Sequence, residues 1–393
     1  MLTETKTQRV ERIKQTKDGL EVINDIYVYA VMGLEVDPDD IDRFKWYGLS
    51  PQDKKLQDKN DQTLYFTLCV KVQAGQLDIK QLEILESISK DFARDTAQLT
   101  FRQNMQFSFI QVRNLPEIFR RLDSVGLSTK FAAGDVPRNI VSCPVNGIDY
   151  DQISDVRPIV EKVNKYLDGN KKFSNLPRQF KVAISGCHTH CINHEIQDIS
   201  FTAVKISQTK TLFDINVTAQ NNSKEKTLIN IGQVTASQIL SVVKAISIIF
   251  RDHGDRSNRD NARVGYLLEK WGKEKFLKTL HKEINFTIRT SQTNELVEFS
   301  RKGHLGIHES TVRSQSYVGV KISQGNLGLI GMQNLLLLLK KYSANTIKLT
   351  SNQNIVILDV PSNQVTNLYN NLAKIKLDTV PSIVKDKTTS CTQ

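Results

Sequence analysis

The stretch Lys71-Val-Gln-Ala-Gly75-Gln-Leu77 occurs a second time in the chain, as Lys321-Ile-Ser-Gln-Gly325-Asn-Leu327. Further along, Thr100-Phe-Arg-Gln103-Asn104-Met-Gln106 recurs as Thr350-Ser-Asn-Gln353-Asn354-Ile-Val356. Both pairs are offset by 250 residues without a gap. Self-similarity at one fixed spacing indicates that the chain contains the same supersecondary unit twice. The fold prediction therefore starts from this repeat.

The residue pattern of each copy predicts a strand, a helix, a second strand and a second helix. In copy 1 these elements are, in order, Tyr65–Val72, Gln81–Phe92, Gln98–Val112 and Pro116–Val125. In copy 2 they are Tyr317–Ile322, Gly331–Tyr342, Thr346–Val360 and Gln364–Ile375. The order is half of a ferredoxin-like unit, a layer of helices on a sheet. Because a lone half would leave its sheet exposed, we expect the two copies to pair about a pseudo-dyad. The predicted fold class is α+β.

The repeat divides the chain into five predicted regions. They are an N-terminal extension (1–60), the first half-domain (61–129), a larger mixed domain (130–305), the second half-domain (306–378) and the start of a further, incomplete domain (379–393). Within the mixed domain, the sequence pattern predicts strands at Phe180–Ser185 and Leu212–Ala219 and helices at Ala236–Phe250 and Asn258–Lys270.

Composition excludes several classes of protein. The 393 residues are 39% hydrophobic and 24% charged, which is typical of a globular protein rather than a disordered one. No run of 18 apolar residues predicts a membrane span, and the start of the chain lacks an apolar signal core, so a cytoplasmic protein is expected. The formal net charge of +11 suits an anionic ligand or an acidic partner. The charge is dispersed, which argues against nucleic acid. Five cysteines in such a chain predict free thiols or metal ligands rather than disulfides.

Basic residues recur in three loop-like segments. Arg138 and Asn139 lie in Gly134–Asn139, Arg178 and Lys181 in Asn175–Lys181, and Arg256, Arg259 and Arg263 in one short run. The i, i+4 spacing of Arg259 and Arg263 places them on one face of the predicted helix. Guanidinium forks bind carboxylates and phosphates through two hydrogen bonds, so these segments suit an anionic ligand. The alternative for each single residue is a solvated basic face.

The cysteines form a second candidate site. The run Cys187-His-Thr-His190-Cys191 could ligate zinc or an iron–sulfur cluster, with Cys143 and Cys391 as candidates to complete the ligand set. The alternative is a turn with small buried thiols. Cys69 lies in a predicted apolar strand and indicates core packing.

Several segments resemble the siroheme-dependent nitrite and sulfite reductases. They are Asp42–Leu49, Thr100–Gln106, Gly134–Pro144 with Gly147-Ile148-Asp149, Asn175–Lys181 and Phe250–Leu267. The resemblance spans nearly the whole chain and includes the repeat. It implies two pseudo-symmetric lobes that grip a siroheme coupled to a [4Fe–4S] cluster. Six electrons, usually from ferredoxin, would reduce nitrite to ammonia or sulfite to sulfide.

The resemblance also implies roles for single residues. Arg138 and Lys181 look like the groups that hold substrate and supply protons. The expected contacts of siroheme, which carries eight carboxylates, are Arg102, Gln103, Asn104, Asn139, Arg178, Arg256, Arg259 and Arg263.

The chain departs from the family pattern at two substrate-site positions. The strand pattern Tyr-Phe-Met-x-Arg-x-Lys is Tyr65-Phe-Thr-Leu-Cys69-Val-Lys71 here, and Leu-Pro-Arg-Lys-Phe-Lys is Leu176-Pro-Arg178-Gln179-Phe-Lys181. Cys69 and Gln179 therefore replace two of four expected cations.

The cluster ligands differ as well. The family binds its cluster through Cys-x5-Cys and Cys-x3-Cys in the second lobe. In this chain Cys391 matches only the first of these cysteines, so the chain is expected to lack the C-terminal cluster-binding part. Cys143, Cys187 and Cys191 occupy the pseudo-symmetric positions of the first lobe. A relic of duplication is the preferred interpretation, because the expected fourth position, six beyond Cys143, is Asp149; the alternative is a metal site of their own. The remaining alternatives are a non-catalytic siroheme-binding paralogue, a truncated fragment, and a zinc-stabilised binding protein built on Cys187, His190 and Cys191.

Overall fold

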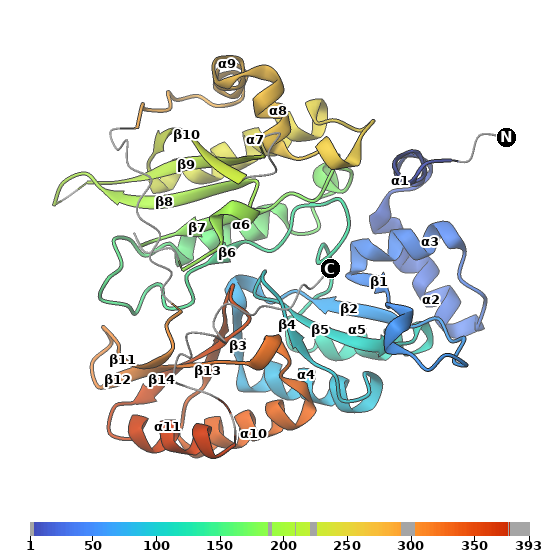
Figure 1. The fold of residues 1–393 in the computed structure, drawn as a ribbon, viewed down its shortest axis with the longest axis vertical. Coiled ribbons are helices and arrows are strands. Elements are labelled where there is room, and N and C mark those ends of the chain that lie inside the picture. Colours follow the sequence, from blue (N-terminus) through green and yellow to red (C-terminus); the bar gives the residue numbers. More distant parts are fainter. Residues whose placement is uncertain are drawn as a thin grey trace. The chain divides into compact units, whose positions relative to one another are not determined.

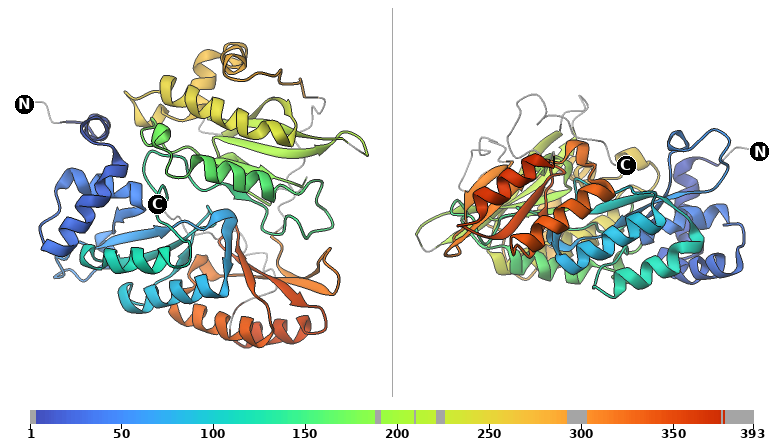
Figure 2. Two further views of the ribbon diagram at one scale, coloured as in Figure 1. Left: turned by 180° about the vertical axis from the view of Figure 1, so that it is seen from behind. Right: turned by 90° about the horizontal axis from the view of Figure 1, so that it is seen from below.

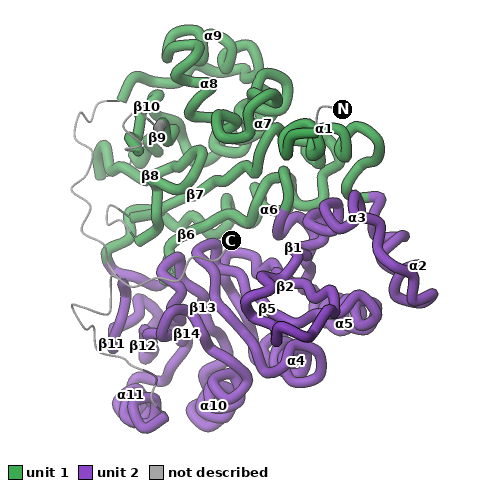
Figure 3. The backbone as a smooth tube through the Cα atoms, turned by 45° about the vertical axis from the view of Figure 1, so that its right-hand side comes forward, with its two compact units in different colours: residues 1–20, 134–147, 151–302 green, residues 21–133, 148–150, 303–393 purple. Residues whose placement is uncertain are grey.

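The computed structural model describes residues 4–187, 191–208, 210–220, 226–291 and 303–377 apart from 376. These residues form two compact units (Figure 3). Unit 1 comprises the described residues within 1–20, 134–147 and 151–302, and unit 2 those within 21–133, 148–150 and 303–393. Both copies of the repeat therefore belong to unit 2. The segment 1–60, expected as one extension, is divided between the units after residue 20.

Unit 2 contains two antiparallel sheets, one for each copy of the repeat (Figure 1). The first sheet has the strand order β1 (Leu49–Pro51), β2 (Phe66–Val70), β5 (Met105–Ile110) and β4 (Gln98–Leu99). The second has the order β11 (Gly306–Glu309), β12 (Gln315–Val320), β14 (Ile355–Pro361), β13 (Thr346–Leu349) and β3 (Gln76–Asp78). Because β3 belongs to copy 1, the sheet of copy 2 is completed by the other copy.

The helices of unit 2 form a layer along these sheets. In the order in which they lie side by side, they are α11 (Val365–Lys374), α10 (Gly328–Lys341), α4 (Ile79–Phe92) and α5 (Leu115–Asp123), as Figure 2 shows. Two further helices, α2 (Val22–Met32) and α3 (Pro38–Arg43), precede the first sheet. Helix α4 begins at a capping box of Asp78 and Gln81 and buries Leu82, Leu85 and Ile88, as its amphipathic sequence predicted.

Reciprocal hydrogen bonds join the two copies about a pseudo-dyad. Gln103 Nε2 donates to Leu349 O at 2.8 Å, and its counterpart Gln353 donates to Leu99 O at 2.9 Å. The strand pairing repeats in the same way, with Gln76 opposite Lys348 and Gln98 opposite Asn326. The predicted pairing of the two copies is thus confirmed.

The second strand of each copy was predicted as one continuous element, and this prediction was wrong. Each stretch is a hairpin, β4–β5 in copy 1 and β13–β14 in copy 2. The turns place Gln103 and Gln353 at φ values of +57° and +60°. In copy 1, Thr100 Oγ1 accepts a hydrogen bond from Asn104 N at 3.1 Å, which closes the turn locally. An uninterrupted β-type pattern concealed this break because the turn contains neither glycine nor proline.

Unit 1 is built on one five-stranded mixed sheet. Its order is β10 (Lys226–Val234), β9 (Thr211–Gln220), β8 (Ile199–Lys205), β7 (Val182–Ser185) and β6 (Val141–Ser142). β6, β7 and β8 run parallel, whereas β8, β9 and β10 are antiparallel. The helices of unit 1 are α1 (Lys6–Thr16), α6 (Arg157–Leu167), α7 (Ile239–His253), α8 (Val264–Trp271) and α9 (Lys273–Glu283). Helices α6 and α7 lie side by side along the sheet (Figure 2). Within the described residues, no helix is long and apolar enough to cross a membrane.

Candidate functional site

Two of the basic loops of unit 1 run side by side and bring Arg138 close to the Arg178–Lys181 segment. Pro137 and Phe180 form a parallel bridge, and Arg138 N donates to Phe180 O at 2.8 Å. The half-buried guanidinium of Arg138 donates to Gly134 O at 3.0 Å, which orients the side chain along its own loop. Sequence proximity could not have shown that these loops meet, because the two segments are separated by about 40 residues in the chain.

A buried carboxylate holds this loop pair. Asp135 accepts hydrogen bonds from Arg259 at 2.6 and 2.8 Å and from Lys14 at 3.3 Å. Burial alone raises the pKa of Asp135, but the hydrogen bond from Arg259 and the positive charges of Lys14 and Arg259 outweigh it and lower the pKa below its ordinary value. Asp135 is therefore an ionised anchor between α1 and the two loops.

Arg178 lies beside this anchor without a hydrogen bond to any group in the described part of the chain. Burial lowers the pKa of Arg178, and the positive charge of Arg259 lowers it further, whereas Asp135 raises it. The Arg259 guanidinium itself binds Asp135 through two of its nitrogen atoms, Nη1 and Nη2. A half-buried guanidinium in this setting favours an anionic ligand, because an added negative charge would replace its lost hydration.

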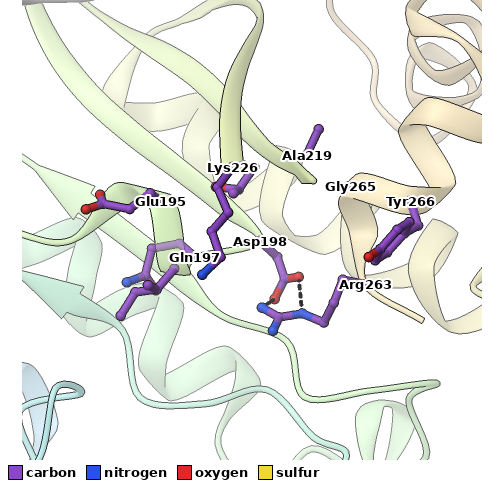
Figure 4. Close-up of a pocket in the computed structure, with 10 residues that line it drawn as sticks. Glu195, Gln197, Asp198, Ala219, Lys226, Arg263, Gly265 and Tyr266 are labelled. Atoms are coloured by element: carbon purple, nitrogen blue, oxygen red, sulfur yellow. Dashed lines mark hydrogen bonds and ion pairs between the residues drawn. The ribbon is translucent and has the colours of Figure 1, made fainter. Parts of the chain in front are cut away.

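A second buried carboxylate, Asp198, positions Lys181. Asp198 is 1% exposed and accepts from Lys181 N at 2.7 Å and from Arg263 at 2.7 and 2.8 Å. Figure 4 shows Asp198 and Arg263 joined in this way at a pocket that Gln197, Lys226 and Tyr266 also line. Because Asp198 occupies the guanidinium of Arg263, Lys226 is the remaining cationic side chain among the residues that line this pocket.

The prediction that Arg259 and Arg263 share a helix face was wrong. Arg259 lies in a 3-10 turn (Arg259–Asn261), and Arg263 is the extended residue before α8. The side chain of Asn258 accepts a hydrogen bond from Asp260 N at 3.0 Å, which favours a turn over a continuing helix. Arg256 instead donates to Glu11 at 2.9 Å and to the side chain of Asn175 at 2.8 Å. All three arginines bind groups of the protein, and their contact with siroheme stays a prediction.

In unit 2, Gln103 and Asn104 maintain the fold. Gln103 carries the bond between the copies, and Asn104 Oδ1 accepts from Val72 N at 3.1 Å. Asn104 Nδ2 lies 3.8 Å from the sulfur of Cys69, so this cysteine is enclosed by the same turn. Arg102 is buried at 8% exposure, and its contact with siroheme stays a prediction.

Sequence reasoning missed two buried lysines in unit 2. Lys71 and Lys348 are 4% and 6% exposed, and Lys348 donates to Ala74 O at 3.2 Å. Lys71 stands at the last position of the Tyr65–Lys71 strand pattern, so that pattern contained a signal for it. Lys348 pairs with Gln76 across the copies, which no local pattern reveals.

Three of the predicted cysteine ligands come together in unit 1. The sulfur atoms of Cys187 and Cys191 lie 3.3 Å apart, and both side chains form hydrogen bonds with Cys143. The pKa of Cys143 is raised well above its ordinary value by the bond to Cys187 and by burial, and that of Cys191 is raised by its bonds to Cys143 and Cys187 and by burial. Cys391 and His190 lie outside the described residues.

Known proteins share both the sequence features and the fold. A family described as "Nitrite and sulphite reductase 4Fe-4S domain" matches residues 133–288. A second, "Nitrite/Sulfite reductase ferredoxin-like half domain", matches residues 57–125 and again 310–375, one match for each copy of the repeat. A protein named sulfite reductase [ferredoxin] 1, from Mycolicibacterium paratuberculosis, is 31% identical, with 97% of this chain and 71% of that protein covered.

The chain belongs to the nitrite and sulfite reductase family. A ferredoxin--nitrite reductase from Leptolyngbya laminosa is also 31% identical, with 82% of this chain and 64% of that protein covered. The solved structure of the Mycobacterium tuberculosis NirA protein superimposes with a TM-score of 0.89 at 31% identity, and covers 98% of this chain and 72% of that one. The predicted family and the two-copy α+β fold are thus confirmed, while the single site residues remain predictions.

Proposed function

We propose that this chain performs the reaction of its family, the six-electron reduction of nitrite to ammonia or of sulfite to sulfide. Siroheme and a [4Fe–4S] cluster would be its cofactors, and a ferredoxin its electron donor. The family match and relatives named for both anions support this proposal. The structural observation that carries it is Arg178, a half-buried guanidinium beside Arg259 with no hydrogen bond to the described residues.

The residues of unit 1 fit a polycarboxylate such as siroheme. Arg178 and Arg138 come from neighbouring loops, and both can bind carboxylates through guanidinium forks. Asn139 is fully buried on the same loop as Arg138 and is the neutral member of this set. When bound, siroheme supplies the iron at which the anion is reduced. Cys391, the expected first cluster ligand, lies outside the described residues.

The side chains of the chain would bind the anion and deliver protons. Arg138 stays charged at any working pH, so it would attract and orient an oxyanion rather than protonate it. Lys181 is held at its backbone by Asp198, and its ammonium group can both attract the anion and give a proton to a departing oxygen. Cys69, Cys143, Cys187 and Cys191 are not joined in disulfides, which suits the reducing cytoplasm, in which we also place the chain.

The test is to purify the full chain anaerobically from a host that makes siroheme, and to assay it with both anions and reduced ferredoxin. We expect siroheme absorption and formation of ammonia, sulfide or both. Arg178→Gln should lose the pigment, whereas Arg120→Gln, at an exposed arginine paired with Glu117, should retain it. A colourless wild-type protein, or equal pigment in the two variants, would contradict the proposal.

One observation favours a second candidate function, a siroheme-binding protein without turnover. Cys69 is buried and lies against Asn104 at a position where the family pattern has a substrate-site arginine. A neutral thiol would hold an oxyanion more weakly than a guanidinium. Bound siroheme together with no reduction of either anion would establish this second function instead.

A further inference from the structure

Cys143, Cys187 and Cys191 form a thiol cluster at one edge of the sheet of unit 1. The parallel strands β6 and β7 pair with Val141 opposite Ala183 and Ser142 opposite Ile184. Because parallel neighbours end at the same edge, the chain leaves both strands there; Cys143 follows β6 directly, and Cys187 follows β7 after Gly186. Cys191 is brought back to the same place, next to Ile192, which packs with Val141 and Ala183.

The thiol cluster is close-packed and shielded from solvent. The sulfur atoms of Cys187 and Cys191 are 3.3 Å apart, and those of Cys143 and Cys191 lie within 4.8 Å. Each of the three residues is at most 6% exposed. Ser185 Oγ lies 3.5 Å from the sulfur of Cys187 and donates to Cys187 O at 3.1 Å, so a hydroxyl fixes the first turn of this loop.

The surrounding loop is built to hold this geometry. Gly186 O accepts hydrogen bonds from Ile153 N at 2.7 Å and Ser154 N at 3.0 Å, and Gln152 forms a bridge with Cys187. A Cβ atom at Gly186 would lie 2.1 Å from Ser154 O, so the loops approach as closely as glycine permits. A relic of duplication under no constraint would not need this support.

The distance between the sulfur atoms of Cys187 and Cys191 can be compared with the distances that three kinds of chemistry require. A disulfide requires an S–S distance of about 2.05 Å, which the 3.3 Å between Cys187 and Cys191 exceeds. In a [4Fe–4S] cluster each thiolate binds a different iron, so the sulfur atoms lie farther apart than around one ion. Two thiolates on one tetrahedral zinc, at Zn–S distances of about 2.3 Å, are about 3.8 Å apart. The observed spacing is nearest to the single-ion arrangement.

We propose that Cys143, Cys187 and Cys191 bind one soft divalent metal ion of the zinc class, with the fourth position open to water or an added ligand. On binding, the ion replaces three thiol protons, which pass to solvent, and no oxidant or reductant is needed. The ion would tie the ends of β6 and β7 to the returning loop at Cys191. This inference does not depend on the proposed reductase activity.

The test is metal binding by the full chain, purified anaerobically with its thiols reduced. After incubation with zinc and removal of the excess, elemental analysis should give about one zinc per chain, as expected for three thiolates around a single ion. Cobalt added to the metal-free protein should produce a thiolate-to-cobalt charge-transfer band that zinc abolishes. A protein that binds neither ion, or whose mass shows a disulfide between Cys187 and Cys191, overturns the proposal, as does equimolar iron and sulfide bound at these cysteines.

Serine variants separate the site from a general effect on folding. Cys143→Ser, Cys187→Ser and Cys191→Ser should each weaken zinc binding by more than about 100-fold, since loss of an outer partner alone costs about 10–100-fold. Cys69→Ser is the matched control, because Cys69 is an equally buried thiol of unit 2. Unchanged affinity in the first three variants, or equal loss in the control, overturns the proposal. If a variant fails to fold, the cobalt titration of the wild-type protein still decides.

Discussion

At the scale of single residues, the buried carboxylates of unit 1 matter as much as the cations that the sequence patterns singled out. Asp135 and Asp198 are 4% and 1% exposed, and each accepts two hydrogen bonds from one arginine. A buried charge is tolerated only when it is paired and hydrogen-bonded. These two carboxylates therefore determine where Arg259 and Arg263 lie, and so which guanidinium is left for an external anion.

We expect Asp135→Asn to lower the free energy of unfolding by about 3–5 kcal/mol at pH 7, because Lys14 and Arg259 would lose their shared counter-charge. The pKa of Asp135 is lowered in the folded state. Its contribution is therefore fully present above the unfolded pKa of about 3.9 and is lost as the pH falls through the folded value. The difference between variant and wild type should shrink below about pH 4, as urea unfolding at several pH values would show.

Asp155→Asn provides the control for this measurement. Asp155 pairs with Arg157 at 2.6 Å, and the two side chains are 38% and 52% exposed. Such a surface pair contributes about 1 kcal/mol or less. Equal destabilisation by the two substitutions, or a pH-independent difference for Asp135→Asn, would show that burial does not set the strength of the Asp135 network.

Two neutral residues stand at positions where the family pattern has cations, Cys69 and Gln179. If the proposed reaction is correct, Cys69→Arg combined with Gln179→Lys should lower the KM for nitrite or sulfite by about tenfold or more, since one charge-assisted hydrogen bond contributes about 1.5–3 kcal/mol. Steady-state kinetics with both anions measure this. Gln179→Met, which has similar length and no charge, should leave KM unchanged. A double variant with wild-type KM would show that these positions do not contact the anion.

At the scale of elements, the sequence predicted the repeat and missed the turn inside it. The 250-residue offset identified both copies. In the structure Gln76 pairs with Lys348 and Gln98 pairs with Asn326, so each pair is the counterpart of the other at that offset. The hairpin turns at Gln103 and Gln353 were not predicted, because glutamine at positive φ is uncommon and has no local signature. Besides the local hydrogen bonds from Asn104 N to Thr100 Oγ1 and from Asn354 N to Thr350 Oγ1, the turns are held by the other copy, where the Gln103 and Gln353 side chains donate to Leu349 O and Leu99 O.

The candidate site was predictable by segment but not by partner. The loops that carry Arg138, Arg178 and Lys181 could be recognised from their residue types. The pairing of Asp135 with Arg259, which are 124 residues apart, could not, because only the folded chain brings them together. The expected helix over Asn258–Lys270 also concealed that Arg259 and Arg263 bind different carboxylates, because a continuous helix would have directed both side chains to one face.

Gly75 tests how closely the two copies approach each other. Its φ is +69°, and a Cβ atom there would lie 2.6 Å from Leu349 O. Gly33 has a similar φ of +64° with nothing within 4 Å, so it isolates the cost of the left-handed backbone. We expect Gly33→Ala to lower the free energy of unfolding by about 1–2 kcal/mol. Gly75→Ala should add about 1–3 kcal/mol to that cost through overpacking. Chemical denaturation of both variants measures the difference, and equal values would mean that the copies can separate without cost.

At the scale of the whole molecule, charge is the property that reaches beyond any single site. The formal net charge is +11, and the basic residues are dispersed along the chain rather than gathered in one run. Several of the guanidinium groups are neutralised by buried carboxylates, as at Asp135 and Asp198. The remaining positive charge acts mainly as a long-range field, which governs encounter rates with charged partners more than the strength of the final contact.

This field leads to a prediction about the electron donor. If the donor is an acidic ferredoxin, its association with this basic chain should be electrostatically steered and therefore sensitive to salt. We expect kcat/KM for ferredoxin to fall by about tenfold or more between about 50 mM and 500 mM sodium chloride, because the screening length shortens several-fold over that range. An uncharged mediator that delivers electrons to the same protein should show little change, because it has no charge to be steered. Stopped-flow or steady-state rates with both donors make the comparison. A parallel fall with both would indicate that salt acts on the protein or on the binding of the anion, and a salt-independent rate with ferredoxin would contradict electrostatic recognition of the donor.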